Sequence, residues 1–322
     1  MANEVLYFHA PCFDGIASAV IASEFLTTHH GWSGIELRPV DYSVRTKWLS
    51  IDPGDRMAVV DFLFHPRASF WADHHTTSFL DERSRSMFQR DANPLWIYDE
   101  DAPSCAGLLW RTLENRFGFR APRFADLMQA AEKIDAAAYQ SVHEAMSTDT
   151  PDMLISASLA VADADYCAFL VRALRDRDLR EVAESPNVRQ RAERTASLSQ
   201  AGLDRLRDTV RVRNEIILFE VDAHGVMLNR YAPWLFFPEA RYSVGVVRGD
   251  HGTKVTTMRN PWREFESVHL GEIAQRFGGG GHQRVASIVV PAAREHDASA
   301  IAQQIAADIT AAEDAERMIG SR

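Results

Sequence analysis

The side chains best suited to chemistry are aspartates and histidines in the first 135 positions of the chain. Asp73, His74 and His75 stand in a row after an apolar stretch, where three adjacent titratable groups are poor at packing or capping. Carboxylate oxygens together with neutral imidazoles suit Mn²⁺, Mg²⁺ or Fe²⁺, whereas the scarcity of thiolates argues against structural zinc. The sequence therefore predicts a divalent-metal centre. Further candidates for it, each following a predicted strand or helix, are His9, Asp14, Asp61 and Asp135.

Each of these residues also has an ordinary explanation when taken alone. A single aspartate after a strand is more often part of a turn or a helix cap. A lone histidine such as His9 is more often packed in a core. The run of three is different, and its coincidence with the other candidates favours metal binding over these alternatives.

A second signal is the run of four glycines at residues 278–281, between Phe277 and His282. Glycines let the backbone approach a ligand closely and turn successive N–H groups toward an anion such as phosphate or carboxylate. A flexible linker is the alternative, but the run lies inside one predicted domain, between an amphipathic helix and an apolar strand. His282 and Arg284 add hydrogen-bond donors beside it.

The first third of the chain alternates short apolar runs with longer amphipathic ones, which predicts helices packed across a largely parallel sheet. A helix is expected at residues 15–26, where apolar residues recur at helical spacing. Because an open α/β sheet binds ligands at the carboxyl ends of its strands, the candidate ligands are expected to meet in one cleft there. The predicted strands are residues 5–9, 35–40, 57–62, 69–72 and 95–98.

The rest of the chain predicts a helical region and a second, smaller α/β domain. Residues 103–191 have a helical pattern, and the polar, arginine-rich segment 189–210 is expected to be a helix that connects two domains. Further helices are expected at residues 270–277 and 298–318. The predicted strands here are residues 216–221, 226–229, 242–247, 255–258 and 285–290. The expected organisation is a metal-binding domain at 1–190, a linker helix at 191–212 and a substrate-binding domain at 213–322.

Length and composition set limits on this interpretation. A chain of 322 residues and 36.2 kDa is expected to form two domains. Its 46% hydrophobic and 25% charged residues exclude a disordered, collagen-like or coiled-coil protein. Three scattered cysteines without a CxxC pair fit a reducing, cytoplasmic setting. Neither a signal peptide nor a membrane-spanning segment is predicted.

The charge balance limits the partners. Thirty-five Lys and Arg against 45 Asp and Glu give a net charge of −10, the wrong sign for a protein that coats long duplex nucleic acid. A small anionic ligand held by local groups is compatible with this charge. We therefore expect a small nucleotide or short single-stranded oligonucleotide as the partner, and no membrane.

The sequence resembles the DHH phosphoesterases, in the subgroup that carries a C-terminal DHHA1 domain, over nearly its whole length. The matching motifs are FHAPCFDG at residues 8–15, VVDF at residues 59–62 and DHH at residues 73–75. The glycine run with His282 resembles the DHHA1 signature. The resemblance implies an α/β fold in which a parallel sheet with helices on both faces precedes a smaller α/β domain.

The resemblance also implies a role for each matching residue. Asp61 would bridge two ions, Asp73 would lie near the metals or orient the histidines, and His75 would face the phosphate, so Asp73 and His75 are the expected catalytic residues. The implied metal ligands are His9, Asp14, Asp61, His74 and Asp135, and the implied substrate-binding residues are Arg259, Gly279, Gly280, Gly281 and His282.

One position departs from the family pattern. Many members have two aspartates in the first motif, separated by one residue, whereas Cys12 stands where the first would fall, in a His-x-x-Cys-x-Asp-Gly variant. One metal position therefore has one carboxylate fewer, and the number of ions stays open. Water, Asp135 or the Cys12 thiolate would complete it, unless Cys12 is a small packed residue.

These features predict a metal-dependent enzyme that hydrolyses phosphodiester or phosphomonoester bonds of short oligonucleotides or small nucleotides, with one or two ions, Mn²⁺ being the first choice. A bound ion would lower the pKa of a water from about 15.7 toward about 7 and draw charge from the phosphate. Two alternatives stay open: a polyphosphate or pyrophosphate hydrolase, and a nucleotide-binding protein whose altered first motif impairs catalysis. Whether the chain forms a homodimer also stays open.

Overall fold

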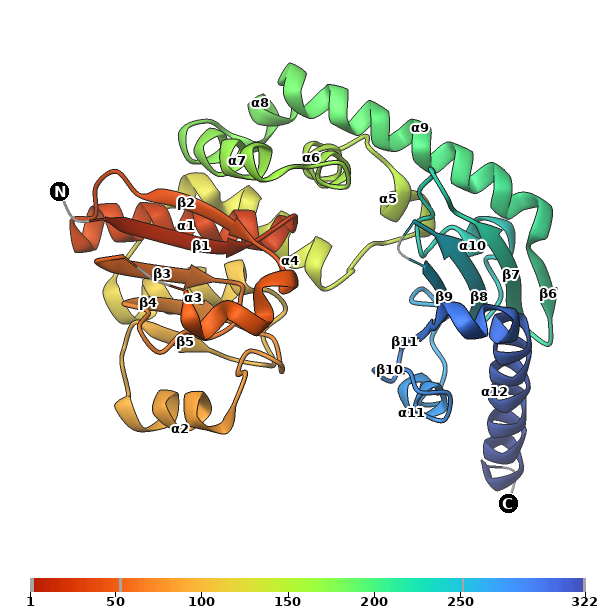
Figure 1. Cartoon of the computed structure of the whole chain (residues 1–322). Coiled ribbons are helices and arrows are strands. Elements are labelled where there is room, and N and C mark those ends of the chain that lie inside the picture. The colour runs from red at the N-terminus through yellow and green to blue at the C-terminus, as the bar shows by residue number, and fades with distance from the viewer. Residues whose placement is uncertain (1–2, 52–53, 251, 321–322) are drawn as a thin grey trace. The chain divides into compact units, whose positions relative to one another are not determined.

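The chain divides into two compact units (Figure 1). The computed structural model describes residues 3–51, 54–250 and 252–320. The first unit comprises Met1–Tyr139 and Ser147–Thr195, and the second comprises Gln140–Met146 and Ala196–Arg322. The division falls inside one long helix, α9 (Pro186–Thr209).

The first unit is built on a five-stranded sheet in the order β2-β1-β3-β4-β5, in which every neighbouring pair is parallel. The three central strands are buried on both faces, which explains their nearly continuous apolar sequences. The predicted parallel sheet is confirmed. Its strands are β1 (Glu4–His9), β2 (Glu36–Val40), β3 (Arg56–Val60), β4 (Phe70–Asp73) and β5 (Trp96–Tyr98).

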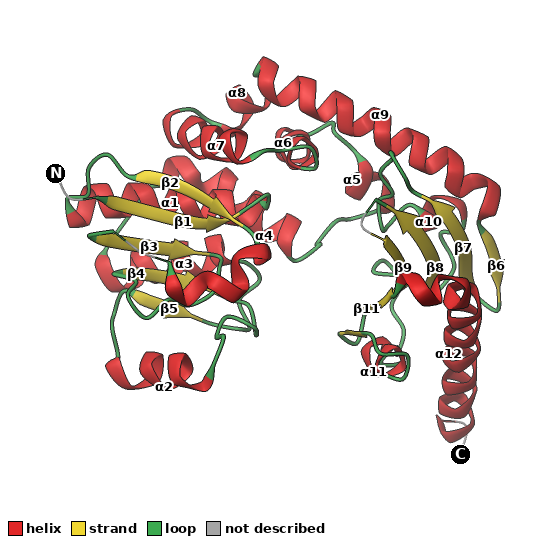
Figure 2. Ribbon diagram, in the orientation of Figure 1, coloured by secondary structure: helices red, strands yellow, loops and turns green. Residues whose placement is uncertain are grey.

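Two separate apolar cores hold this sheet, one on each face. Figure 2 shows the strands of the sheet in yellow and the helices in red. On one face, strand residues such as Phe8 and Val60 pack against α1 (Phe13–His30), α3 (Cys105–Phe117), α4 (Ala125–Asp135) and α7 (Ala164–Asp176). On the other face, Trp71 packs among aromatic residues from the 3₁₀ segment η1 (Tyr42–Ser50) and from α2 (Glu82–Asp91). The remaining helices of this unit include η2 (Pro122–Phe124), α6 (Pro151–Leu159) and α8 (Leu179–Ala183).

Helix α1 begins immediately beside the end of β1, and Gly15 makes that close approach possible. A Cβ at Gly15 would clash with the His9 carbonyl oxygen and would lie 3.2 Å from Asp61 Oδ2. The glycine therefore brings Asp14, in the first turn of α1, next to the residues that follow β1 and β3. The close packing of α1 on β1 therefore also fixes the position of Asp14.

The second unit contains a six-stranded mixed sheet in the order β10-β11-β9-β8-β7-β6, in which only β7 and β8 pair in parallel. One face packs on α11 (Leu270–Gln275) and α12 (Ala298–Gly320) through buried residues such as Val244 and Ile305. The short helices α5 (Val142–Met146), α10 (Pro233–Phe236) and η3 (Ala292–Asp297) complete it. The strands are β6 (Arg211–Arg213), β7 (Ile216–Asp222), β8 (Tyr242–Gly249), β9 (Gly252–Arg259), β10 (Gly280–Gly281) and β11 (Val285–Val290).

The strand predicted at residues 226–229 is wrong, because this apolar segment is a loop that packs on α9. The Met227 N–H donates to the Leu198 carbonyl at 3.1 Å. Gly202 lies so close to the Met227 carbonyl that a Cβ there would clash with it. The Met227 N–H thus bonds to helix α9, whereas the apolar pattern predicted that it would bond to another strand. None of the helices in the described part of the chain has the length and apolar character needed to cross a membrane.

The contact between α1 and the end of β1 gives a stability prediction. Gly15→Ala is expected to lower the free energy of unfolding by about 1–3 kcal/mol, because the new methyl group must push α1 away from β1. Denaturant unfolding measures the change. Ser23→Ala in the same helix is the control, since its buried hydroxyl has no hydrogen-bond partner among the described residues and its loss should be neutral or stabilising. Equal stability of Gly15→Ala and the wild type would contradict the proposed close packing.

Candidate metal centre

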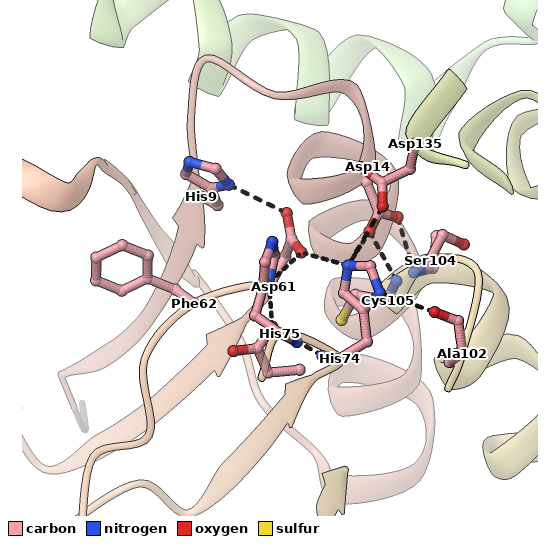
Figure 3. Close-up of polar contacts among 12 residues, drawn as sticks. His9, Asp14, Asp61, Phe62, His74, His75, Ala102, Ser104, Cys105 and Asp135 are labelled. Carbon is pink, nitrogen blue, oxygen red and sulfur yellow. Dashed lines mark hydrogen bonds and ion pairs between the residues drawn. The ribbon is translucent and has the colours of Figure 1, made fainter. Parts of the chain in front are cut away.

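The candidate ligands gather where three neighbouring parallel strands end (Figure 3). His9 is the last residue of β1, Asp61 directly follows β3, and Asp73 ends β4. The predicted convergence of these residues at the carboxyl ends of the strands is therefore present in the structure, and Asp14 reaches it from α1.

The imidazole of His74 lies at the middle of the cluster. Its Nδ1 is 2.9 Å from the Ala102 carbonyl oxygen, so Nδ1–H donates to this oxygen and Nε2 faces the carboxylates. That Nε2 lies 3.3 Å from Asp135 Oδ2 and 3.7 Å from oxygens of both Asp14 and Asp61. A backbone carbonyl that fixes the tautomer and aims the other nitrogen is the arrangement commonly found around metal-binding histidines.

Asp14 is held by the N-terminus of α3. Its two oxygens accept hydrogen bonds from the N–H groups of Cys105, at 2.7 Å, and Ala106, at 2.9 Å. Ser104 caps this helix through the N–H of Gly107. Burial and the nearby Asp135 nevertheless raise the pKa of Asp14 to about 6, because the two backbone bonds offset only part of the desolvation.

Asp61 is the most constrained carboxylate of the cluster. It is 1% exposed, and neither side-chain oxygen has a hydrogen-bond partner in the described part of the chain. Its backbone adopts the left-handed conformation, with φ of 54°, which is strained for a residue other than glycine. Burial, and then the charge on Asp14, raise the pKa of Asp61 well above its usual value. A buried carboxylate without hydrogen-bond partners is costly while it is ionised, so it either takes up a proton or is compensated by a bound cation.

His9 offers a neutral nitrogen to the same oxygen pair. Its Nδ1 lies 3.4 Å from Asp61 Oδ2 and, like His74 Nε2, is buried without a hydrogen-bond partner among the described residues. Burial and the proximity of His75 lower the pKa of His9, which keeps the imidazole in the form that binds a metal.

The donor atoms of the cluster fit divalent cations. The donor atoms form three groups, and within each group the atoms lie within 4.8 Å of one another. Asp61 belongs to two of these groups. Oxygen and imidazole donors dominate, which suits Mn²⁺, Mg²⁺ or Fe²⁺. The groups are His9 with Cys12 and Asp61, Asp61 with His74 and His75, and Asp14 with His74 and Asp135.

Asp73 faces its own loop rather than the centre of the cluster. Its Oδ1 lies 2.8 Å from His75 Nδ1 and accepts the His74 N–H at the same distance, and its Oδ2 accepts the Ser78 hydroxyl at 2.5 Å. Asp73 thus orients the ring of His75. Burial lowers the pKa of His75, but the bond to Asp73 and the surrounding carboxylates outweigh it, and the net shift is upward.

In the second unit, part of the glycine run lines a pocket of about 390 Å³ on the open face of the sheet. Gly280, Gly281 and His282 form one side of it. Gly279 instead packs against β11, where a Cβ would lie 2.5 Å from the Ser287 carbonyl oxygen.

Arg259 does not line this pocket. It is 8% exposed, and its guanidinium donates to the carbonyls of Asn260 and Phe265 while lying 4.3 Å from the centre of the Phe265 ring. The side chain therefore holds the loop that follows β9.

Sequence reasoning missed several groups that shape the two sites. The Ala102 carbonyl and the N–H groups of α3 belong to the backbone, so the residue types in the sequence do not indicate them. The start of α3 was nevertheless indicated by Ser104, a common helix cap. Arg230 and Lys254 supply positive charge to the pocket of the second unit, but in the sequence each is a single cation between uncharged neighbours.

No family model matches the sequence, and no curated protein matches it. Solved structures do. The pGpG-specific phosphodiesterase PggH of Vibrio cholerae is 17% identical with a TM-score of 0.70, over 95% of this chain and 99% of that one. RecJ of Thermus thermophilus in complex with Mn²⁺ is 15% identical with a TM-score of 0.56, over 94% of this chain and 52% of RecJ. An exopolyphosphatase-related protein of Bacteroides fragilis is 10% identical with a TM-score of 0.50, over 94% and 92%.

These structures match nearly the whole chain, so the expected fold is confirmed: it is the fold of PggH and RecJ. The chain spans about half the length of the Thermus thermophilus RecJ.

The crowded carboxylates give a prediction for the metal-free protein. Because Asp14 has a folded pKa of about 6 against an ordinary 3.8, its contribution to stability is complete below about pH 4 and is lost as the pH rises through 6. Removing a negative charge from the cluster should therefore stabilise the metal-free protein above that range. Asp61→Asn is expected to raise the melting temperature at neutral pH, since asparagine also tolerates the left-handed backbone.

Thermal melts with a chelator, with and without added Mn²⁺, measure this effect. The variant should gain less from Mn²⁺ than the wild type, and its advantage should disappear below about pH 4. Asp208→Asn, on an exposed face of α9, is the control and should change little. A variant that melts below the wild type at neutral pH without metal would contradict the interpretation of Asp61 as an uncompensated charge.

Proposed function

We propose that this protein is a divalent-metal-dependent phosphoesterase that acts on small nucleotides or short single-stranded oligonucleotides. The metal ligands would be His9, Asp14, Asp61, His74 and Asp135. The observation that carries the proposal is the buried Asp61, whose unpaired oxygens face two imidazole nitrogens that also lack partners in the described part of the chain.

The bound ions would supply an activated water and would draw charge from the phosphate oxygens. Within the protein, Ala102 fixes His74 with Nε2 toward the carboxylates. His75 is the proton-transfer candidate, because Asp73 bonds Nδ1 and leaves Nε2 for the leaving oxygen or the phosphoryl group. We therefore assign His75 as the catalytic residue and Asp73 as the residue that positions it.

We further propose a division of labour along the chain. Residues 1–190 would hold the metals, residues 191–212, most of which lie in α9, would connect the two parts, and residues 213–322 would bind the part of the substrate that does not react. The pocket beside Gly280, Gly281 and His282 supports this role, because exposed glycines and an imidazole offer donors to an anion.

The composition of that pocket favours a nucleotide over polyphosphate. Its walls include Phe219, Met258 and Val247, and cations come from Arg230 and Lys254. Apolar and aromatic surface suits a base, whereas polyphosphate offers only charged oxygens and would need a row of cations. The neighbour PggH is a pGpG-specific phosphodiesterase, and the fold is thus compatible with a dinucleotide substrate.

Manganese is the ion we propose first. The donor set is composed mainly of carboxylates and imidazoles, and RecJ structures of this fold hold Mn²⁺ or Mg²⁺. Metal removal by chelation should abolish turnover, and Mn²⁺ should restore it.

A substrate panel tests the proposed activity. The wild type with Mn²⁺ should hydrolyse a linear dinucleotide such as pGpG faster than polyphosphate or pyrophosphate. His74→Ala should lose at least about 10³-fold in kcat/KM, since it removes a group at the centre of the cluster. Tight nucleotide binding without turnover would instead identify a binding protein, and faster turnover of polyphosphate would reassign the substrate class.

The assigned role of His75 gives a separate prediction. His75→Gln is expected to lower kcat by about 10²–10⁴-fold while Mn²⁺ affinity stays close to that of the wild type. Steady-state kinetics and metal titration by calorimetry measure the two quantities. Loss of Mn²⁺ binding in parallel with kcat would show that His75 is a metal ligand instead.

Substitution of the two cationic residues that line the pocket tests its proposed role in substrate binding. Lys254→Ala or Arg230→Ala should raise KM for a dinucleotide by about tenfold and leave kcat nearly unchanged, because these side chains would hold substrate away from the reacting bond. Arg213→Ala is the matched control, since Arg213 is exposed on β6 and does not line the pocket. An effect on kcat alone would argue against this placement of the substrate.

A further inference from the structure

We propose that the Cys12 sulfur is a metal ligand, which makes the position shared with His9 and Asp61 a mixed nitrogen–oxygen–sulfur site. The inference rests on the proposed function, because it assigns one more ligand to the same metal centre. It concerns the residue by which this chain departs from the two-aspartate pattern, and it predicts which metals that position prefers.

Three possible metal donors lie close together at the end of β1. Donor atoms of His9, Cys12 and Asp61 all lie within 4.8 Å of one another. Cys12 lies between β1 and α1 in an extended conformation, with φ of −141° and ψ of 137°, and precedes the first helical residue. Serine, threonine, aspartate or asparagine usually occupy such a position because they cap the helix. The Cys12 side chain makes no capping bond to α1.

The other donor atoms of this group have no hydrogen-bond partners among the described residues. His9 Nδ1 and both Asp61 oxygens are buried and unpaired among the described residues, and Asp61 is 1% exposed. Buried polar atoms without partners are rare in proteins and point to a bound group. A cation bound by the Cys12 sulfur, the imidazole and the carboxylate would satisfy these atoms together.

The other two cysteines lie in different surroundings from Cys12. Cys105 and Cys167 are buried in the apolar core around α1, and the Cys105 thiol donates to the Ala72 carbonyl at 3.4 Å. Cys12 is only partly buried and is not part of that core. Packing accounts for the other two cysteines, whereas the neighbours of Cys12 include metal-binding side chains.

A sulfur donor changes metal preference in a defined direction. Thiolate favours Zn²⁺, Co²⁺ and Fe²⁺ over Mg²⁺, whereas the group formed by Asp14, His74 and Asp135 contains only oxygen and nitrogen donors. On binding, the S–H bond breaks, the proton passes to the buffer and a metal–sulfur bond forms. No oxidant or reductant takes part in this step.

Cobalt titration of the full chain tests the proposal without an activity assay. Co²⁺ added to the metal-free wild type under reducing conditions should produce a near-ultraviolet thiolate-to-cobalt charge-transfer band. Cys12→Ser should lose that band, and Cys12→Asp should bind Co²⁺ without it. Cys167→Ser should retain it. Cys12→Asp should also lower the ratio of Zn²⁺ to Mn²⁺ affinity by at least about tenfold.

The outcomes separate this inference from the proposed function. A wild type that binds Co²⁺ without the charge-transfer band, or a Cys12→Ser variant that keeps it, would overturn the assignment of sulfur and leave the phosphoesterase intact. A wild type that binds no divalent ion at all would overturn both.

A second measurement uses only the wild-type chain and so avoids any folding defect of a variant. Prolonged alkylation of metal-free protein with iodoacetamide at alkaline pH, followed by peptide mass mapping, should modify Cys12, because the alkaline pH offsets the raised pKa of the thiol. Saturation with Zn²⁺ should slow that modification by at least about tenfold, because a metal-bound sulfur is a poorer nucleophile. Equal rates with and without Zn²⁺ would contradict coordination.

Discussion

The mutual repulsion of closely spaced carboxylates, two of them buried, is the constraint around which the first unit is organised. Asp14, Asp61 and Asp135 surround one imidazole nitrogen, and the backbone at Asp61 is held in a left-handed conformation to complete the arrangement. Such a cluster costs stability unless a cation neutralises it. It persists because two apolar cores, one on each face of the sheet, hold β1, β3 and β4 in place. The packing of the sheet therefore offsets the electrostatic strain, and an open metal position results.

The two buried carboxylates receive unequal support from the backbone: Asp14 accepts two N–H bonds, whereas Asp61 accepts none among the described residues. Asp14 accepts two N–H groups at the positive end of α3, which holds its charge and fixes both oxygens. Asp61 receives no such help, so burial raises its pKa well above the usual value. The carboxylate with the least protein support has the most to gain from a cation. This asymmetry is consistent with the expectation that Asp61 is the ligand shared between two ions.

Short-range patterns carried most of the information that could be extracted from the sequence. The three central strands of the first unit have nearly continuous apolar sequences, and His74 directly follows one of them. The apolar pattern therefore predicted the parallel sheet, and the positions of the histidines and aspartates after the strands predicted their cluster. Long-range backbone contacts were beyond reach: the Ala102 carbonyl that aims His74 lies 28 residues away and has no sequence signature. The strand predicted at residues 226–229 was wrong because a backbone N–H of this loop bonds to helix α9 instead of to a neighbouring strand. Arg259 was assigned by resemblance, and its bonds to nearby carbonyls were not visible in the sequence.

The presence of a cysteine at residue 12 follows from the same electrostatic constraint. An aspartate there would add another negative charge beside Asp61 and Asp14, in a cluster that already lacks compensation without metal. Burial, and then the charge on these two residues, raise the pKa of the Cys12 thiol, so the metal-free protein carries it as a neutral group. A thiol contributes an anionic donor only when a cation displaces its proton. Cysteine thus reduces repulsion in the metal-free state while keeping a ligand available, at the expense of affinity for hard cations such as Mg²⁺.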